Sequence, residues 1–235
     1  MVKRNTAIKI RKVHRYLGIF LGIQFLMWTI SGLYFSWTDI DEIHGDQYKQ
    51  LPPQKMSFSN LSGTANLKGA EKIQSMQLLE IAGQPYYWIN GESLYNAQTG
   101  EQKQNITEEE ALEVAARHMR PDLKVSAIKI IDKVGPQHEY RERPLPAYEI
   151  SYATKDDLKA YVAFKNGAFQ TVRHQSWRWF DFLWMTHTMD YKGRDDINTV
   201  ALRSFSLLGL VTVLSGFLLW FTTSPTLRKV IKRKN

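Results

Sequence analysis

Two uncharged, mainly apolar runs stand at either end of a longer polar segment. The first extends from Tyr16 to Trp37 and the second from Ser204 to Phe221. About 20 apolar residues, at a helical rise of 1.5 Å each, span a hydrocarbon core of roughly 30 Å. The pattern therefore predicts two transmembrane helices. The first run is too long for a signal peptide and lacks a cleavage site after it, so we expect an uncleaved anchor.

Between these runs, short segments alternate apolar and polar residues, as is typical of β-strands. Thr107 and Glu110 form a capping-box pattern before a helical apolar stripe. Asn90-Gly91 and Asn166-Gly167 are the dipeptides most typical of tight hairpin turns. We predict two tandem helix-plus-meander units, the first with a degraded helix. The predicted strands are 76–82, 85–89 and 93–101 in the first unit, and 125–131, 146–150, 159–164 and 169–172 in the second.

This pattern divides the chain into five parts. We expect a basic tail with the first membrane helix (1–38), an α+β domain (39–175), an interfacial aromatic segment (176–197), the second membrane helix (198–223) and a second basic tail (224–235).

The charge distribution predicts the orientation in the membrane. The chain has a net charge of +8, and 11 of its 31 Lys and Arg residues lie in 1–15 and 224–235, which contain no Asp or Glu. The other 20 Lys and Arg residues lie in the central segment, which also contains all 23 acidic residues. By the positive-inside rule both tails are cytoplasmic and the central domain is periplasmic, in a bacterial inner membrane. A nucleic-acid partner is not needed to explain the excess of basic residues. The absence of cysteine excludes disulfides and thiolate sites.

One face of the first helix carries an unusual set of residues. At 100° per residue, one quarter of the helical wheel contains His14, Gly18, Gly22, Phe25, Thr29, Gly32 and Ser36. Gly18 and Gly22 form a GxxxG motif that suits close helix packing. Alternatively, the small residues form a groove for a haem with His14 as axial ligand. Both interpretations can hold together.

Polar residues also gather just outside the two membrane helices. Asp39, Asp41, Glu42 and His44 follow the first helix, and they represent either a solvated acidic segment or a site for ferric iron. His187 lies in the aromatic segment before the second helix, so we place it at the outer membrane surface with His44. Arg203 is a candidate partner for a haem propionate, or an arginine that snorkels to the interface.

The remaining motifs are uninformative or absent. His118, His138 and His174 show no spacing that builds a metal or catalytic site, and we expect them at the surface. The chain has no HExxH, GxSxG or GxGxxG motif, which argues against a protease and against a bound nucleotide donor.

The helix sequences resemble those of the PepSY-associated transmembrane family. The first run, HRYLGIFLGIQFLMWTISGLYFSW, is similar to the family's first helix, and FLWMTHTM followed by LLGLVTVLSGFLLWF is similar to its closing helix. The units that end in YNAQTGE and FKNGAFQTV resemble PepSY domains. By this resemblance His14 and His187 match histidines of the helix motifs, with His44 as a further candidate. The resemblance implies haem b and reduction of ferric iron, free or siderophore-bound, in support of iron uptake.

The larger members of this family have four helices, whereas this chain has two. One chain offers a single histidine, His14, at the cytoplasmic side. A twofold homodimer supplies it twice and makes a four-helix bundle with one or two haems. We therefore expect a membrane α-helical protein with an exported α+β PepSY-like domain and a cytoplasmic or quinol electron donor. The alternative is a non-enzymatic PepSY module that binds or regulates a peptide, protease or partner protein.

Overall fold

The computed structural model describes residues 4–50, 56–70 and 72–224. The chain forms two compact units. The membrane unit comprises Met1–Trp37 with Asp181–Asn235, and the β unit comprises Thr38–Phe180. The division falls within one helix, α4 (Gln175–Thr188).

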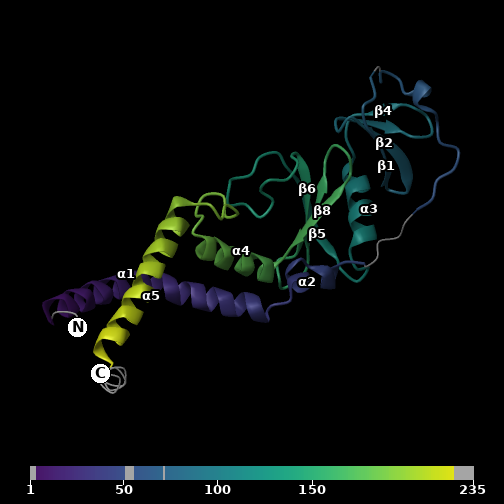
Figure 1. Cartoon of the computed structure of the whole chain (residues 1–235). Coiled ribbons are helices and arrows are strands. Elements are labelled where there is room, and N and C mark those ends of the chain that lie inside the picture. The colour runs from purple at the N-terminus through teal and green to yellow at the C-terminus, as the bar shows by residue number, and fades with distance from the viewer. Residues whose placement is uncertain (1–3, 51–55, 71, 225–235) are drawn as a thin grey trace. The chain divides into compact units, whose positions relative to one another are not determined.

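Two long helices, α1 (Arg4–Trp37) and α5 (Val200–Thr223), form the membrane unit with the end of α4 (Figure 1). Residues 8–37 and 200–221 are long and apolar enough to cross a membrane, which confirms the two predicted helices. The first helix begins earlier than its uncharged run, because Lys and Arg are good helix formers. The second starts at a cap, where the Thr199 hydroxyl accepts from the Leu202 N–H (3.1 Å).

The helices α1 and α5 pack through one stripe each and leave their other faces apolar and exposed. Phe20 stacks on Phe205 with ring centroids 5.6 Å apart. Gly209 approaches the ring of Phe25 so closely that a Cβ there would lie 3.1 Å from it. Outward residues such as Ile23 are 76 % exposed, which suits contact with lipid.

The loop between α4 and α5 is held by one carboxylate. The carboxylate of Asp190 accepts hydrogen bonds from the backbone N–H groups of Lys192 (3.2 Å), Gly193 (3.1 Å) and Asp196 (3.0 Å). These hydrogen bonds, that from Asp196 first, outweigh the effect of burial and lower the pKa of Asp190. Arg194 forms an ion pair with Asp181 in the same unit.

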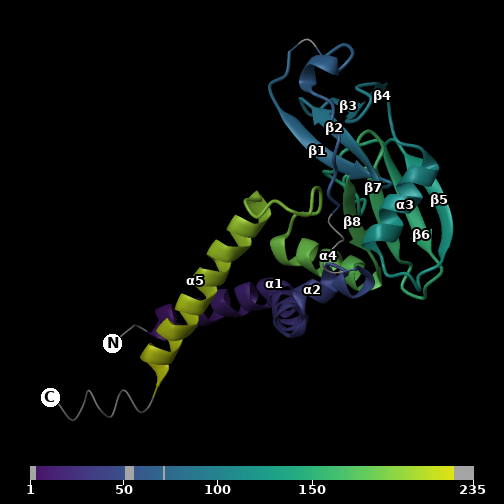
Figure 2. The same cartoon turned by 90° about the vertical axis from the view of Figure 1, so that its right-hand side faces the viewer.

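The β unit contains two four-stranded antiparallel meanders (Figure 2). The tandem arrangement agrees with the prediction, but the strand predicted at 93–101 ends at Asn96, and residues 102–103 form a fourth strand that was not predicted. One sheet is formed by β1 (Met76–Ile81), β2 (Gln84–Ile89), β3 (Ser93–Asn96) and β4 (Gln102–Lys103). The other is formed by β5 (Val125–Ile131), β6 (Ala147–Tyr152), β7 (Lys159–Ala163) and β8 (Phe169–Arg173). Asn90 and Gly91 turn between β2 and β3 with φ of 55° and 74°, a left-handed conformation that these two residue types tolerate.

A single long helix, α3 (Glu108–His118), serves both meanders. The predicted capping box is present, since Thr107 accepts from the Glu110 N–H and Glu110 accepts from the Thr107 N–H. Its apolar face joins one core with residues of both sheets, namely Ile81, Tyr86, Leu94, Ile150, Val162 and Val172. Between residues 44 and 107, the only helical segments among the described residues are two short 3₁₀ turns, Asp46–Tyr48 and Thr64–Asn66, so the first meander has no α-helix of its own there. A four-residue helix, α2 (Ile40–Ile43), precedes them.

Candidate functional site

His14 lies on the face of α1 that packs against α5. Its Nδ1 is 2.7 Å from the hydroxyl oxygen of Ser215. That hydroxyl also lies 2.7 Å from the carbonyl oxygen of Thr212. A serine has one hydrogen to donate and a carbonyl can only accept, so Ser215 donates to Thr212 and accepts from His14. For a neutral imidazole this arrangement assigns the proton of His14 to Nδ1 and the lone pair to Nε2.

The ring of His14 rests directly on a glycine of α5. A Cβ on Gly216 would lie 3.2 Å from His14 Cε1. Gly216 also lines an apolar hollow of about 470 Å³ together with Val213, Phe217 and Trp220. The imidazole is thus fixed by a hydroxyl and a backbone contact, beside a surface that suits a flat apolar group.

His187, near the end of α4, is held in the same way. Its Nδ1 is 2.7 Å from the hydroxyl of Ser31, which donates to the carbonyl of Met27 at 2.7 Å. By the same reasoning the proton is on Nδ1 and the lone pair on Nε2. Burial lowers the pKa of His187, so the neutral imidazole is favoured. The rings of Trp28 and Phe35 flank it, with centroids at 6.4 and 5.6 Å.

Two polar side chains of α1 fix the end of α4. The last carbonyls of a helix have no partner inside that helix. Gln24 donates to the carbonyl of Thr186 (3.1 Å) and Trp28 to that of His187 (2.8 Å). These contacts explain why a glutamine stands in the mainly apolar part of α1.

The two imidazoles lie at different levels of α1. Ser31 follows His14 by 17 residues, which is about 25 Å along the axis at 1.5 Å per residue. The two histidines therefore cannot ligate one iron. Each is a separate candidate ligand, close to either end of the membrane span.

The structure divides the face that the sequence predicts for α1. His14 and Phe25 contact α5, whereas Cβ atoms on Gly18, Gly22 and Gly32 would meet nothing within 4 Å. The GxxxG motif is thus not the contact between α1 and α5, and its surface is open for another group. Arg203 lies exposed in the first turns of α5, with Nη2 3.4 Å from Asn198 Oδ1. Its role toward a propionate stays a prediction.

The acidic segment after α1 forms no preorganised metal site. Asp39 caps α2 by accepting from the Asp41 N–H (2.9 Å), and Asp39, Asp41 and Glu42 are exposed. Within the described ranges, no three His, Cys, Asp or Glu side chains come together as metal ligands. The use of these carboxylates by ferric iron stays a prediction. His44 belongs to the β unit, where it and His118 line a cavity that we call the basic cavity.

The expectation that the other histidines lie at the surface is wrong for His174. It is 1 % exposed, and its Nε2 donates to the carbonyls of Glu42 (3.1 Å) and Ile43 (3.2 Å). Burial lowers the pKa of His174, although both carbonyls oppose this. His118 is half-buried and stacks on Phe169 at 4.5 Å. These contacts join segments far apart in sequence, so spacing does not reveal them.

Sequence reasoning missed Ser31 and Ser215. A signal for them exists, because each membrane helix contains a Ser-Gly dipeptide inside its apolar run, in ISGLYF and in LSGFLLWF. In both helices the serine of this dipeptide contacts a histidine of another helix.

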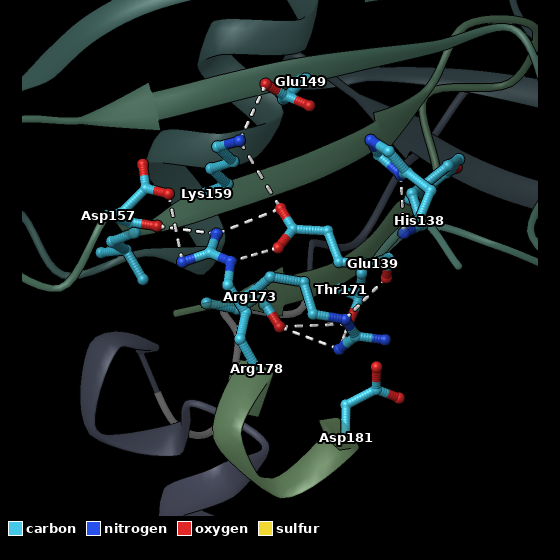
Figure 3. A network of polar contacts seen from close by, with 12 residues as sticks. His138, Glu139, Glu149, Asp157, Lys159, Thr171, Arg173, Arg178 and Asp181 are labelled. Carbon is cyan, nitrogen blue, oxygen red and sulfur yellow. Dashed lines mark hydrogen bonds and ion pairs between the residues drawn. The ribbon is translucent and has the colours of Figure 1, made fainter. Parts of the chain in front are cut away.

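A charged network in the β unit fixes the first turn of α4 (Figure 3). Glu139 accepts from Arg178 Nε (2.5 Å) and from the Tyr161 hydroxyl (2.6 Å). Lys159 lies 3.7 Å from Glu139 and 3.4 Å from Glu149. Burial opposes ionisation of Glu139, but Arg178, Tyr161 and Lys159 together lower its pKa. Arg178 and Lys159 are thus paired with Glu139 and Glu149, and these ion pairs act as a structural brace.

The fold and the histidine sites define a membrane-anchored protein with a tandem antiparallel β unit. The chain belongs to the family described as the PepSY-associated TM region, which matches residues 11–235. This match confirms the resemblance in the helix motifs. No curated protein and no solved structure matches the chain.

Proposed function

We propose that this protein is a haem b-dependent electron carrier of a bacterial inner membrane that reduces ferric iron, free or siderophore-bound, on the periplasmic side. The supporting observation is the pair of imidazoles, His14 and His187, each with Nδ1 hydrogen-bonded to a serine. Haem iron binds neutral imidazole, and a hydrogen bond at the other ring nitrogen fixes the tautomer and orientation of such a ligand.

The residues fit this cofactor chemically. His14 and His187 would ligate the iron through Nε2, and bound haem would supply a one-electron couple. Ser215 and Ser31 keep the proton on Nδ1. The ring of His14 keeps its place because Gly216 has no side chain to displace it. Apolar side chains of α1 and α5 exclude water.

The proposal includes a homodimer that forms a four-helix bundle. Two histidines that held one haem together would have to lie at the same level, and each chain places one candidate, His14 or His187, near each end of α1. A second copy supplies the other. The open surface at Gly18 and Gly22 allows close approach of a helix or a macrocycle. One or two haems per dimer are compatible with this arrangement.

The basic tails support the proposed direction of electron flow. With both tails cytoplasmic, His14 lies toward a cytoplasmic or quinol donor and His187 toward the periplasm. The exposed carboxylates Asp39, Asp41 and Glu42 would attract ferric iron at the outer side.

The test is the absorption spectrum of the detergent-solubilised chain, followed by ferric reduction measured with a ferrous-specific dye. We expect a Soret band. His14→Ala should disturb the inner haem and leave the outer one reducible by dithionite. His187→Ala should remove the outer haem. His44→Ala shows whether His44 is a ligand. The control is His138→Ala, since that half-exposed side chain lies in a loop of the β unit. A colourless protein, or wild-type spectra and rates in both His14→Ala and His187→Ala, would refute the proposal in favour of a partner-binding PepSY module.

A further inference from the structure

The basic cavity lies wholly within the β unit and has a volume of about 440 Å³. This volume falls in the range of small-molecule sites. Its walls come from the segment after α2, the end of α3, the loop between β5 and β6, strand β8 and the first turn of α4. The side chains that matter here are His44, Lys49, His118, Arg143, Arg173 and Trp177.

Cations outnumber anions in this cavity. Lys49, Arg143 and Arg173 face one carboxylate, Asp46, which lies 2.7 Å from Lys49. In the part of the chain that the structure describes, no carboxylate lies within 4.0 Å of either arginine's guanidinium. This contrasts with Arg178 nearby, which pairs with Glu139 (2.5 Å) in the network of Figure 3.

Arg173 is a buried cation held in a fixed orientation. It is 8 % exposed, and its guanidinium lies 3.9 Å from the ring centroid of Trp177. Nε donates to the Glu139 carbonyl (2.9 Å) and Nη1 to the Thr171 hydroxyl (2.5 Å). Nη2 makes no hydrogen bond to the described residues, so both of its hydrogens are available. Burial and the charge of Arg143 lower the pKa of Arg173 to about 10, so it stays charged at neutral pH.

Arg143 adds further donors at the same cavity. Its Nη1 donates to the Gln170 carbonyl (3.0 Å), which ties it to β8. A guanidinium has five N–H donors, and the described residues accept only this one from Arg143. Arg143 and Arg173 repel each other, and the attraction of Glu139 for Arg173 is a smaller effect than this repulsion, so an anion that joins the two guanidinium groups would lower their cost.

We infer that the basic cavity binds a small oligocarboxylate anion. A carboxylate matches the planar fork of a guanidinium, and three cations around one cavity suit two or three carboxylates on a short carbon skeleton. Phe169, with the His118 ring stacked on it, provides an apolar wall for that skeleton. A single phosphate presents one anionic centre, whereas the lining of the cavity offers three cationic side chains. This inference does not depend on the haem.

The test is calorimetric titration of the full chain in detergent with citrate at low ionic strength. We expect saturable binding that Arg143→Gln weakens at least tenfold, because a charged hydrogen-bond donor is lost. Lys49→Gln should weaken it several-fold, since Asp46 already neutralises part of that charge. The matched control is Arg120→Gln, an exposed arginine paired with Asp122 (2.7 Å).

Three results would overturn the inference. The first is that folded wild-type protein, shown by a cooperative melt, releases or absorbs no heat on addition of citrate. The second is that Arg143→Gln and Lys49→Gln bind citrate as tightly as Arg120→Gln, which would place binding elsewhere, for example on the basic tails. The third is that inorganic phosphate binds as tightly as citrate. Should Arg143→Gln fail to fold, Lys49→Gln decides alone.

Discussion

The hydroxyl of Ser215 offers a sharp test of the proposed role of His14 as a haem ligand. In Ser215→Ala the Nδ1–H of His14 loses its acceptor, and the ring is free to rotate and to change tautomer. Hydrogen bonds between membrane helices contribute about 0.6 kcal/mol on average, and those in proteins generally about 0.5–1.5 kcal/mol. We therefore expect the helix pair to lose only about 0.6–1.5 kcal/mol of stability.

The expected loss of haem affinity is larger. Removal of the hydrogen-bond partner of a ligating histidine commonly lowers metal affinity about 10- to 100-fold, which equals about 1.4–2.8 kcal/mol. The assay is Soret titration of the apoprotein with haem, alongside unfolding in denaturing detergent. Ser206→Ala is the matched control, because Ser206 is an exposed serine of the same helix. Ser215→Thr should restore part of the affinity. Equal haem affinity in Ser215→Ala and Ser206→Ala would refute the reasoning.

Three further predictions test other parts of the structure. Gly216→Ala places a Cβ 3.2 Å from His14 Cε1. We therefore expect haem affinity to fall several-fold in the same titration and the haem spectrum to shift. An unchanged spectrum would contradict the contact between His14 and Gly216. A Cβ at Gly18 would meet nothing within 4 Å among the described residues, so Gly18→Leu should abolish dimers in analytical ultracentrifugation without lowering thermal stability; persisting dimers would argue against this interface. Because burial lowers the pKa of His174 from its ordinary 6.5, denaturant unfolding should show stability falling as the pH drops through the range between 6.5 and the folded pKa. His174→Gln, which keeps a donor and does not titrate, should flatten this dependence; a parallel curve would exclude His174 as its source.

The strands were predictable because their signals are local. Alternation defines residues 125–131, which are β5, and Asn90-Gly91 marks a turn that needs positive φ. The same holds for the cap at Thr107, where both partners lie within one turn.

The contacts of the histidines were not predictable from spacing. Ser215 and His14 are 201 residues apart, and Ser31 and His187 are 156 apart. Only packing of α1 with α5 and α4 brings them together. The small-residue face of α1 was visible in the sequence, but the wheel could not show that the glycines remain open while His14 contacts α5.

The shared position of α3 has a consequence for the repeat as a whole. The first meander has no α-helix of its own in the described residues, and Ile81, Tyr86 and Leu94 are buried in the core that α3 completes. A fragment that ends after β4 would expose these side chains to water. A fragment that begins at α3 would expose the apolar side chains of α3 that pack against the first meander. We therefore expect that neither meander folds as an autonomous domain, and that the β unit unfolds in one cooperative step.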